Sequence, residues 1–166
     1  MPHETWKNNF VKNVVGAYFY NKRNFTKMFP GEQSGLMKLV QREDNKNTAV
    51  VVERKNDNAY AHLKNTIFWD PNAACKYSNG ISVSPATRLA HEGEHANNNT
   101  ESVESIQAFH DRVNTPNEVF ENDEEEGVIT GGEHKQAEAN GEVESGQKVR
   151  EDHNGIFYPV NNFWER

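Results

Sequence analysis

Hydrophobic positions between residues 48 and 70 lie in short runs separated by polar residues. The segments "TAVVVER", "AYAHL" and "TIFWD" are rich in β-branched or aromatic residues, and "KNDN" and "KN" separate them. Apolar runs of this length, bounded by Asn, Asp and Lys, are typical of strands joined by hairpin loops. The pattern therefore predicts consecutive antiparallel strands from Thr48 to Asp70.

The rest of the chain is more polar. Residues 1–47 contain scattered aromatic residues, and we expect a strand or short helix there, followed by a turn at "FPGEQSG". "DPNAACKYSNG" has the composition of a loop, and residues 100–122 have that of a polar connection with a turn at "NTPNE". The tail "GIFYPVNNFWER" predicts a short strand and an aromatic anchor.

Two helices are predicted in the second half of the chain. Ser84 is a favourable N-cap, and Pro85 follows at the first helical position, where its missing N–H costs nothing. This helix should end in "NNNT". A second helix is expected from about Val119 to Asn140, weakened at its paired glycines, 131 and 132, by about 1 kcal/mol each relative to alanine. A small antiparallel sheet packed on these helices predicts an α+β fold.

Composition limits the classes of function. The 166 residues fit one domain, residues 1–166, with residues 1–47 as an N-terminal extension. A net charge of -7 argues against a nucleic-acid partner, because phosphate binding needs a basic face. No apolar run approaches the roughly 20 residues of a spanning helix, and the first residues do not resemble a secretory signal. Cys75 is the only cysteine, so it forms no internal disulfide, and we expect a small, partly buried residue.

The most informative stretch is "HEGEH", from His91 to His95. Residues four apart lie on one face of a helix, so these two imidazoles can converge on one metal ion. A catalytic zinc takes three protein ligands and keeps a fourth position for water, whose pKa falls to about 7. Glu92 lies about 100° round the helix, where it can take that water's proton as general base. The alternative is a solvated polar helix with two incidental histidines.

A third ligand must come from elsewhere in the chain. Four carboxylates on or near the second helix are candidates: Glu124, Glu125, Glu126 and Glu133. The acidic run also has a simpler interpretation, since negative charge at a helix start complements the helix dipole. The other histidines outside the motif and the C-terminal region lack the spacing of a second site and are expected at the surface: His3, His62, His110 and His134.

The motifs "SPATRLAHEGEHA", "EEGVITG", "EH" and "GEVESGQKVREDH" together resemble the zinc metallopeptidase domains of bacterial toxins and effectors, found in RHS-type polymorphic toxins and type III effectors. The resemblance covers about residues 67–158. It implies a zincin-like fold, zinc ligands at His91 and His95, and a general base at Glu92. The third ligand falls on Glu125 or Glu126. We favour Glu126, which precedes Ile129 by three residues as in related proteases.

The resemblance also implies an oxyanion-stabilising pair. Arg150 matches the family arginine of an R-x-x-Y motif, but His153 stands where the tyrosine is expected. A protonated His153 could donate to the oxyanion, Tyr158 could replace it, or His153 could be a surface residue. Glu133 is expected to hold a zinc ligand or Arg150 in place.

The residues thus predict a zinc-dependent endopeptidase whose edge strand pairs with an extended substrate. The resemblance implies a toxin or effector that is delivered by a non-classical route, acts on a protein in the target cytoplasm, and has a cognate immunity protein as partner. Two alternatives stay open: a zinc amidase acting on cell-wall peptides, and a non-catalytic zincin-like binding module. An intact Glu92 argues against the second.

Overall fold

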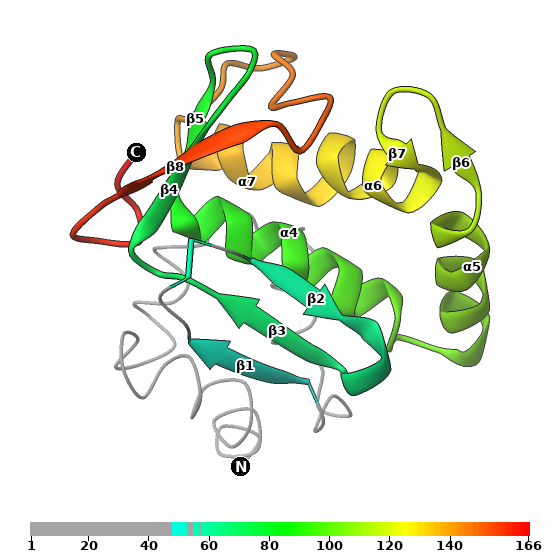
Figure 1. Ribbon diagram of the computed structural model, residues 1–166. Helices are drawn as coiled ribbons and strands as arrows, with labels where there is room; N and C mark the ends of the chain where they lie inside the picture. Colours follow the sequence, from blue (N-terminus) through cyan, green and yellow to red (C-terminus); the bar gives the residue numbers. More distant parts are fainter. Residues whose placement is uncertain (1–47, 53–54, 57) are drawn as a thin grey trace.

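The computed structural model describes residues 48–52, 55–56 and 58–166, and these form a mixed α+β structure (Figure 1). The α+β prediction is confirmed at this level. The elements expected in residues 1–47 lie outside the described residues.

Strands β1 (Ala49–Val52), β2 (Ala59–Ala61) and β3 (Thr66–Trp69) form one sheet in the order β1-β3-β2. Strand directions alternate along the chain as predicted, but β3 lies in the middle. It pairs antiparallel with β2 and parallel with β1, so the prediction of a wholly antiparallel sheet is wrong. The central place goes to the most buried of the three strands, whose Ile67 and Trp69 are fully buried.

A second sheet has the order β5-β4-β8, formed by β4 (Ala73–Tyr77), β5 (Ser82–Val83) and β8 (Gly155–Pro159). The predicted C-terminal strand is present as β8. The loop predicted across "DPNAACKYSNG" is wrong, because β4 pairs with β8 along its whole length, from Ala73 opposite Pro159 to Tyr77 opposite Gly155. Cys75 in β4 is a buried free thiol.

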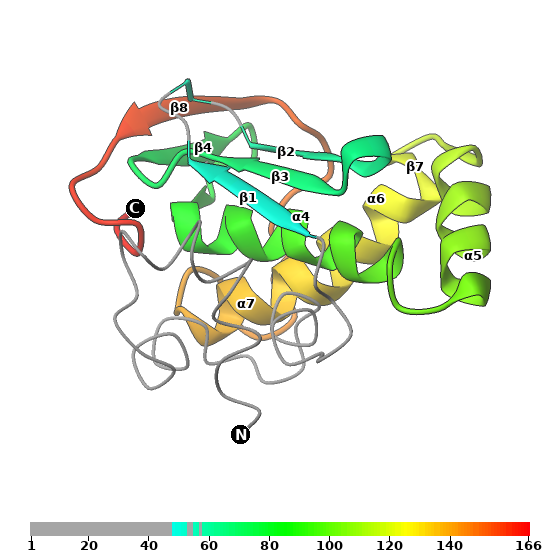
Figure 2. The ribbon, with the colours of Figure 1, turned by 90° about the horizontal axis from the view of Figure 1, so that it is seen from below.

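Helix α4 (Pro85–Asn98) begins and ends where the sequence predicted. The Ser84 hydroxyl accepts a hydrogen bond from the Thr87 N–H, and Pro85 occupies the first turn. Both views place α4 between the β1-β3-β2 sheet and the helix of residues 123–139 (Figures 1 and 2).

Residues 100–122 are more ordered than predicted. They contain helix α5 (Val103–Val113), capped by reciprocal hydrogen bonds between Ser102 and Ser105, and a hairpin of β6 (Pro116–Asn117) and β7 (Glu121–Asn122). The predicted turn at "NTPNE" is only partly right, because it covers the link from α5 and strand β6, and the hairpin turns at residues 118–120.

The second helix begins four residues later than predicted, after the Asn122 N-cap. It consists of α6 (Asp123–Val128), a π-helical turn η2 (Ile129–Glu133) and α7 (His134–Ala139). Both glycines lie in the π-helical turn, and a Cβ on Gly132 would clash with the carboxylate of Glu94 from α4. Gly132 thus lets the two helices approach closely. A 3-10 turn, η1 (His62–Lys64), completes the described elements. None of the helices in the described part of the chain has the length and apolar character needed to cross a membrane.

Candidate metal centre

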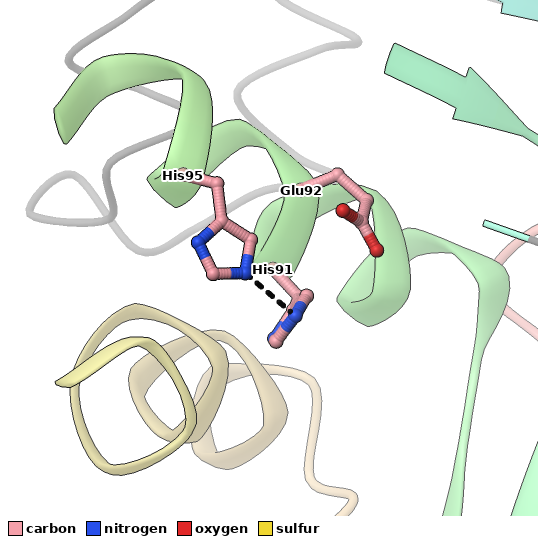
Figure 3. A group of neighbouring side chains, drawn as sticks. All are labelled: His91, Glu92 and His95. Atoms are coloured by element: carbon pink, nitrogen blue, oxygen red, sulfur yellow. Dashed lines mark hydrogen bonds between the residues drawn. The ribbon is translucent and has the colours of Figure 1, made fainter. Parts of the chain in front are cut away.

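Helix α4 directs two imidazoles to one point. His91 and His95 are buried, and their Nε2 atoms lie 3.1 Å apart, which confirms the one-face prediction (Figure 3). Both rings face the yellow helix α6, while Glu92 points to the side (Figure 3). One ligand atom from each of these three residues lies within 4.8 Å of the others.

Each histidine is held by its own buried carboxylate at the opposite ring nitrogen. Glu133 Oε2 lies 2.6 Å from His91 Nδ1, and Glu124 Oε1 lies 3.1 Å from His95 Nδ1. An ionised carboxylate only accepts, so each Nδ1 donates its hydrogen to its carboxylate, and Nε2 is the nitrogen that faces the other histidine. Carboxylates in this position orient most metal-binding histidines in proteins.

Helix α6 brings Glu125, and not Glu126, to the histidine pair. Glu125 Oε1 lies 3.0 Å from His95 Nε2, and its Oε2 lies 3.5 Å from His91 Nε2. Glu126 is exposed and accepts a hydrogen bond from the Asn117 side chain in the β6-β7 hairpin. The preference for Glu126 is therefore not supported, because one residue along a helix turns the side chain by about 100°.

The donor set fits a small cation. The two Nε2 atoms face each other at hydrogen-bond distance, an arrangement that needs a proton or a metal ion between them. Glu125 Oε2 is buried and accepts no hydrogen bond of good geometry. Burial disfavours the charged form of His95, but hydrogen bonds to Glu124 and Glu125 raise its pKa to about 10. The same negative surroundings would attract a divalent ion, and two imidazoles with a carboxylate are a ligand set typical of zinc.

Arg150 connects this cluster to the C-terminal region. Its guanidinium donates to both oxygens of Glu133, with Nε at 2.9 Å from Oε1 and Nη2 at 2.9 Å from Oε2. Burial opposes ionisation of Glu133, but Arg150 and His91 hold the pKa of that carboxyl well below its usual range. Glu133 thus contacts both a candidate ligand and Arg150, as the sequence predicted.

His153 lies at the edge of the cluster although half of its side chain is exposed. Arg150 Nη1 lies 3.0 Å from His153 Nδ1, and an arginine only donates, so this Nδ1 accepts. The remaining nitrogen, Nε2, then carries the hydrogen and lies 3.3 Å from Glu125 Oε2. His153 therefore contacts Glu125 from the solvent side, at ion-pair distance and without a hydrogen bond of good geometry.

A cleft of about 290 Å³ opens over the cluster. His91, Glu92, His95, Arg150 and His153 all line it. Tyr158 is not among the described residues that line it. In β8 the neighbouring Phe157 faces Arg88 of α4, so strand alternation turns Tyr158 to the other face of the sheet. The geometry therefore does not support Tyr158 in the oxyanion role.

Some residues that support the site have no clear signal in the sequence. Glu124 stood among four candidate carboxylates, but its role depends on Arg112 and Asn98, which donate to its two oxygens. Arg112 lies on α5, and the Ser102 cap and an apolar stripe at Ile106, Phe109 and Val113 could have revealed that helix. The other histidines of the described region lie outside the cluster, with His62 exposed and His110 and His134 partly exposed.

Comparison of the chain with protein-family models, with curated proteins and with solved structures found no match. The family resemblance therefore rests on the sequence motifs, and the function must be argued from the geometry of the site.

Proposed function

We propose that this chain is a zinc-dependent hydrolase that cleaves peptide bonds. The observation that carries the proposal is the facing pair of imidazole Nε2 atoms on α4, each histidine held at Nδ1 by its own buried carboxylate. Structural zinc sites are usually closed by four protein ligands. Here His91, His95 and Glu125 would supply three, and the cleft above them is open to a substrate.

His91, His95 and Glu125 would hold a zinc ion, which would supply a Lewis acid for the scissile carbonyl and lower the pKa of a water to about 7. Glu92 would accept the proton from this water and pass it to the leaving amine, since its carboxylate lies beside the histidine pair (Figure 3). Arg150 lines the cleft while its charge is held by Glu133. It would stabilise the oxyanion that develops on the scissile carbonyl.

His153 would hold neighbouring side chains in place and would not donate a hydrogen bond to the oxyanion. Its Nδ1 accepts from Arg150 and its Nε2 faces Glu125, so both ring nitrogens are already in contact with protein groups. In this proposal it fixes the third ligand and the arginine relative to each other.

Strand β2 supports an extended peptide as the substrate. It is an edge of the β1-β3-β2 sheet, and Ala59 and Tyr60 line the cleft. Peptides commonly bind by adding a strand to such an edge, where main-chain hydrogen bonds give affinity independent of sequence.

The proposal extends to a delivered bacterial toxin or effector with a cognate immunity protein. Its support is the resemblance of the "LAHEGEHA" and "REDH" segments to such domains. Expression in a bacterial cell without an immunity protein, wild type against Glu92→Gln, tests this part separately. Growth arrest by wild type alone supports it, and equal growth contradicts it.

The activity is tested by cleavage of casein with zinc-loaded protein. Glu92→Gln should lower the rate by about 100- to 10,000-fold, the usual contribution of a general base, while zinc content stays at one per chain. Glu126→Gln is the matched control and should retain full activity, because that side chain is exposed and outside the cluster. Equal rates in wild type and Glu92→Gln would contradict the proposal. Cleavage of peptidoglycan but not casein would favour the cell-wall amidase.

A further inference from the structure

The cleft has two chemically different ends. Strand β2 runs along α4 in the same direction (Figure 1). Asn58 accepts a hydrogen bond from the Asp70 N–H at the end of β3, and the preceding residue, Trp69, donates its indole N–H to the Pro85 carbonyl. Asn58 therefore marks the end of the cleft nearest the N-terminus of α4.

The opposite end is aromatic. The Tyr60 hydroxyl accepts from the side chain of Asn99, the C-cap residue of α4. The Phe109 ring packs edge-on against Tyr60 at 6.5 Å and against His95 at 6.4 Å. The histidine pair thus lies between an aromatic end and the Asn58 end.

Arg88 lies at the Asn58 end and is the arginine of this region without a carboxylate partner. It precedes His91 by three residues on α4 and lines the cleft. Its Nη1 donates to the Tyr77 hydroxyl at 3.2 Å, and its Cζ lies 4.6 Å over the Phe157 ring. Its Nε is buried and has no hydrogen-bond partner of good geometry among the described residues, although the Cys75 thiol also contacts the Arg88 side chain.

The neighbouring arginines are paired differently. Arg150 is neutralised by Glu133 and Arg112 by Glu124, whereas no carboxylate of the described residues forms an ion pair with Arg88. A buried donor of a charged group without an acceptor is costly, so such a group is expected to have a ligand that supplies one.

Asn58 offers a second donor at the same end. Its side chain is 7% exposed, and its Oδ1 is occupied by the Asp70 N–H. This bond fixes the orientation of the amide, so Nδ2 is the remaining end, and it is buried without a hydrogen-bond partner among the described residues. Asn58 also lines the cleft. Two unsatisfied donors, one of them cationic, therefore lie at one end of the proposed active site.

We propose that Arg88 and Asn58 form a subsite for a carboxylate of the substrate, so that the enzyme prefers peptides with an acidic side chain near the scissile bond. This inference rests on the proposed function for its biological meaning, but the anion site itself does not require catalysis. Charged acceptors suit a guanidinium best, because charge-assisted hydrogen bonds are about twice as strong as neutral ones.

Binding is tested with two matched probes, N-acetyl-glutamate N-methylamide and its glutamine counterpart. The full chain with added zinc is titrated while the arginine Nε–Hε signals are followed by NMR, with the Arg88 signal identified by its loss in Arg88→Gln. The glutamate probe should shift the Arg88 signal, the glutamine probe should not, and the Arg150 signal should stay in place. An unmoved Arg88 signal, or an equal shift with both probes, would overturn the subsite.

Cleavage preference is tested with a degenerate peptide library whose products are sequenced. Wild type should enrich Asp and Glu at one position beside the cleaved bond. Arg88→Gln should lower this enrichment by about 10-fold or more, the effect of losing a hydrogen bond to a charged group. Arg166→Gln, at an exposed arginine outside the cleft, is the control and should leave the enrichment unchanged.

The two experiments separate the two proposals. If wild type leaves the library intact but the Arg88 signal shifts, the peptidase proposal fails and the anion site stands. If wild type cleaves without acidic preference, or with a preference that survives in Arg88→Gln, the anion subsite fails and the peptidase proposal stands.

Discussion

Helix α4 and the helix of residues 123–139 contribute to the same cluster in different ways. Helix α4 supplies His91, Glu92 and His95 through regular spacing, so each side chain's direction follows from its position in the sequence. The second helix supplies only carboxylates: Glu124 and Glu125 lie in α6, and Glu133 is the last residue of the π-helical turn η2. Their directions depend on how this helix packs against α4.

This difference separates groups that would touch the metal or the substrate from groups that hold them. On α4, His91 and His95 would bind the metal, and Glu92 would act on the attacking water. On the second helix, Glu125 would act directly, while Glu124 and Glu133 act through the histidines. Substitutions in the second helix should therefore have graded effects.

The largest effect within the second helix is expected for Glu125→Gln. It removes the charge of the proposed third ligand, and zinc affinity should fall by more than the roughly 10- to 100-fold typical of outer-sphere partners. Glu126→Gln changes the adjacent, exposed carboxylate and should leave the affinity unchanged. Competition with a zinc-binding dye measures both. A loss in Glu126→Gln with none in Glu125→Gln would restore the assignment made from the sequence.

The next effect concerns the two carboxylates behind the histidines. Glu133→Gln and Glu124→Gln should each weaken zinc binding by about 10- to 100-fold. Their stability costs should differ. Glu133→Gln leaves the buried Arg150 unpaired and should lower the free energy of unfolding by about 3–5 kcal/mol. The Arg112 side chain is 38% exposed and can be hydrated when Glu124 is replaced. Glu124→Gln should therefore lower the free energy of unfolding by less than Glu133→Gln does. Equal losses in urea titrations would contradict this distinction.

A smaller effect is expected at the paired glycines of the π-helical turn. At Gly131 an added Cβ meets nothing within 4 Å, so Gly131→Ala should gain up to about 1 kcal/mol from helix propensity. At Gly132 the methyl group would displace the Glu94 carboxylate, so Gly132→Ala should be less stable than Gly131→Ala. Adding Glu94→Ala to Gly132→Ala should remove the penalty in a double-mutant cycle. Equal stability of the two single variants would show that close approach of the helices is unimportant.

The smallest effect is expected where the ends of the two helices meet. Burial raises the pKa of Glu142, although its Oε1 accepts from the Ser84 N–H at 3.1 Å. The folded state thus binds this proton more tightly than the unfolded chain, so the carboxyl's contribution to stability decreases as pH rises from its usual pKa through the raised one. Glu142→Gln should raise Tm by roughly 2 °C at pH 7 and have no such effect at pH 3. A gain of equal size at both pH values would contradict a role for the charge.

Local signals predicted α4 and failed at contacts between distant segments. The Ser84 cap and Pro85 define the helix start without any tertiary information. Strand β4 was missed because Ala73 and Ala74 have low strand propensity and their pairing partners lie in β8, more than 80 residues away. Strand β1 was expected beside β2, but burial of Ile67 and Trp69 gives β3 the central place.

The site was predictable to a similar extent. The spacing of the motif predicted the histidine pair and Glu92 as site residues, and the family resemblance predicted Arg150 and Glu133. The choice between Glu125 and Glu126 depends on the direction of α6 relative to α4, which adjacent glutamates do not encode. Arg88 had no signal at all, because its role follows from the absence of a carboxylate beside it among the described residues.

X-ray absorption spectroscopy of the zinc-loaded chain reports the ligands of the proposed metal centre. We expect one zinc with two imidazole nitrogens at about 2.0–2.1 Å and carboxylate oxygen, without sulfur. We also expect that His91→Ala and His95→Ala each abolish this signal. Failure to bind zinc at one per chain, or a spectrum without two imidazoles, would contradict the proposed centre.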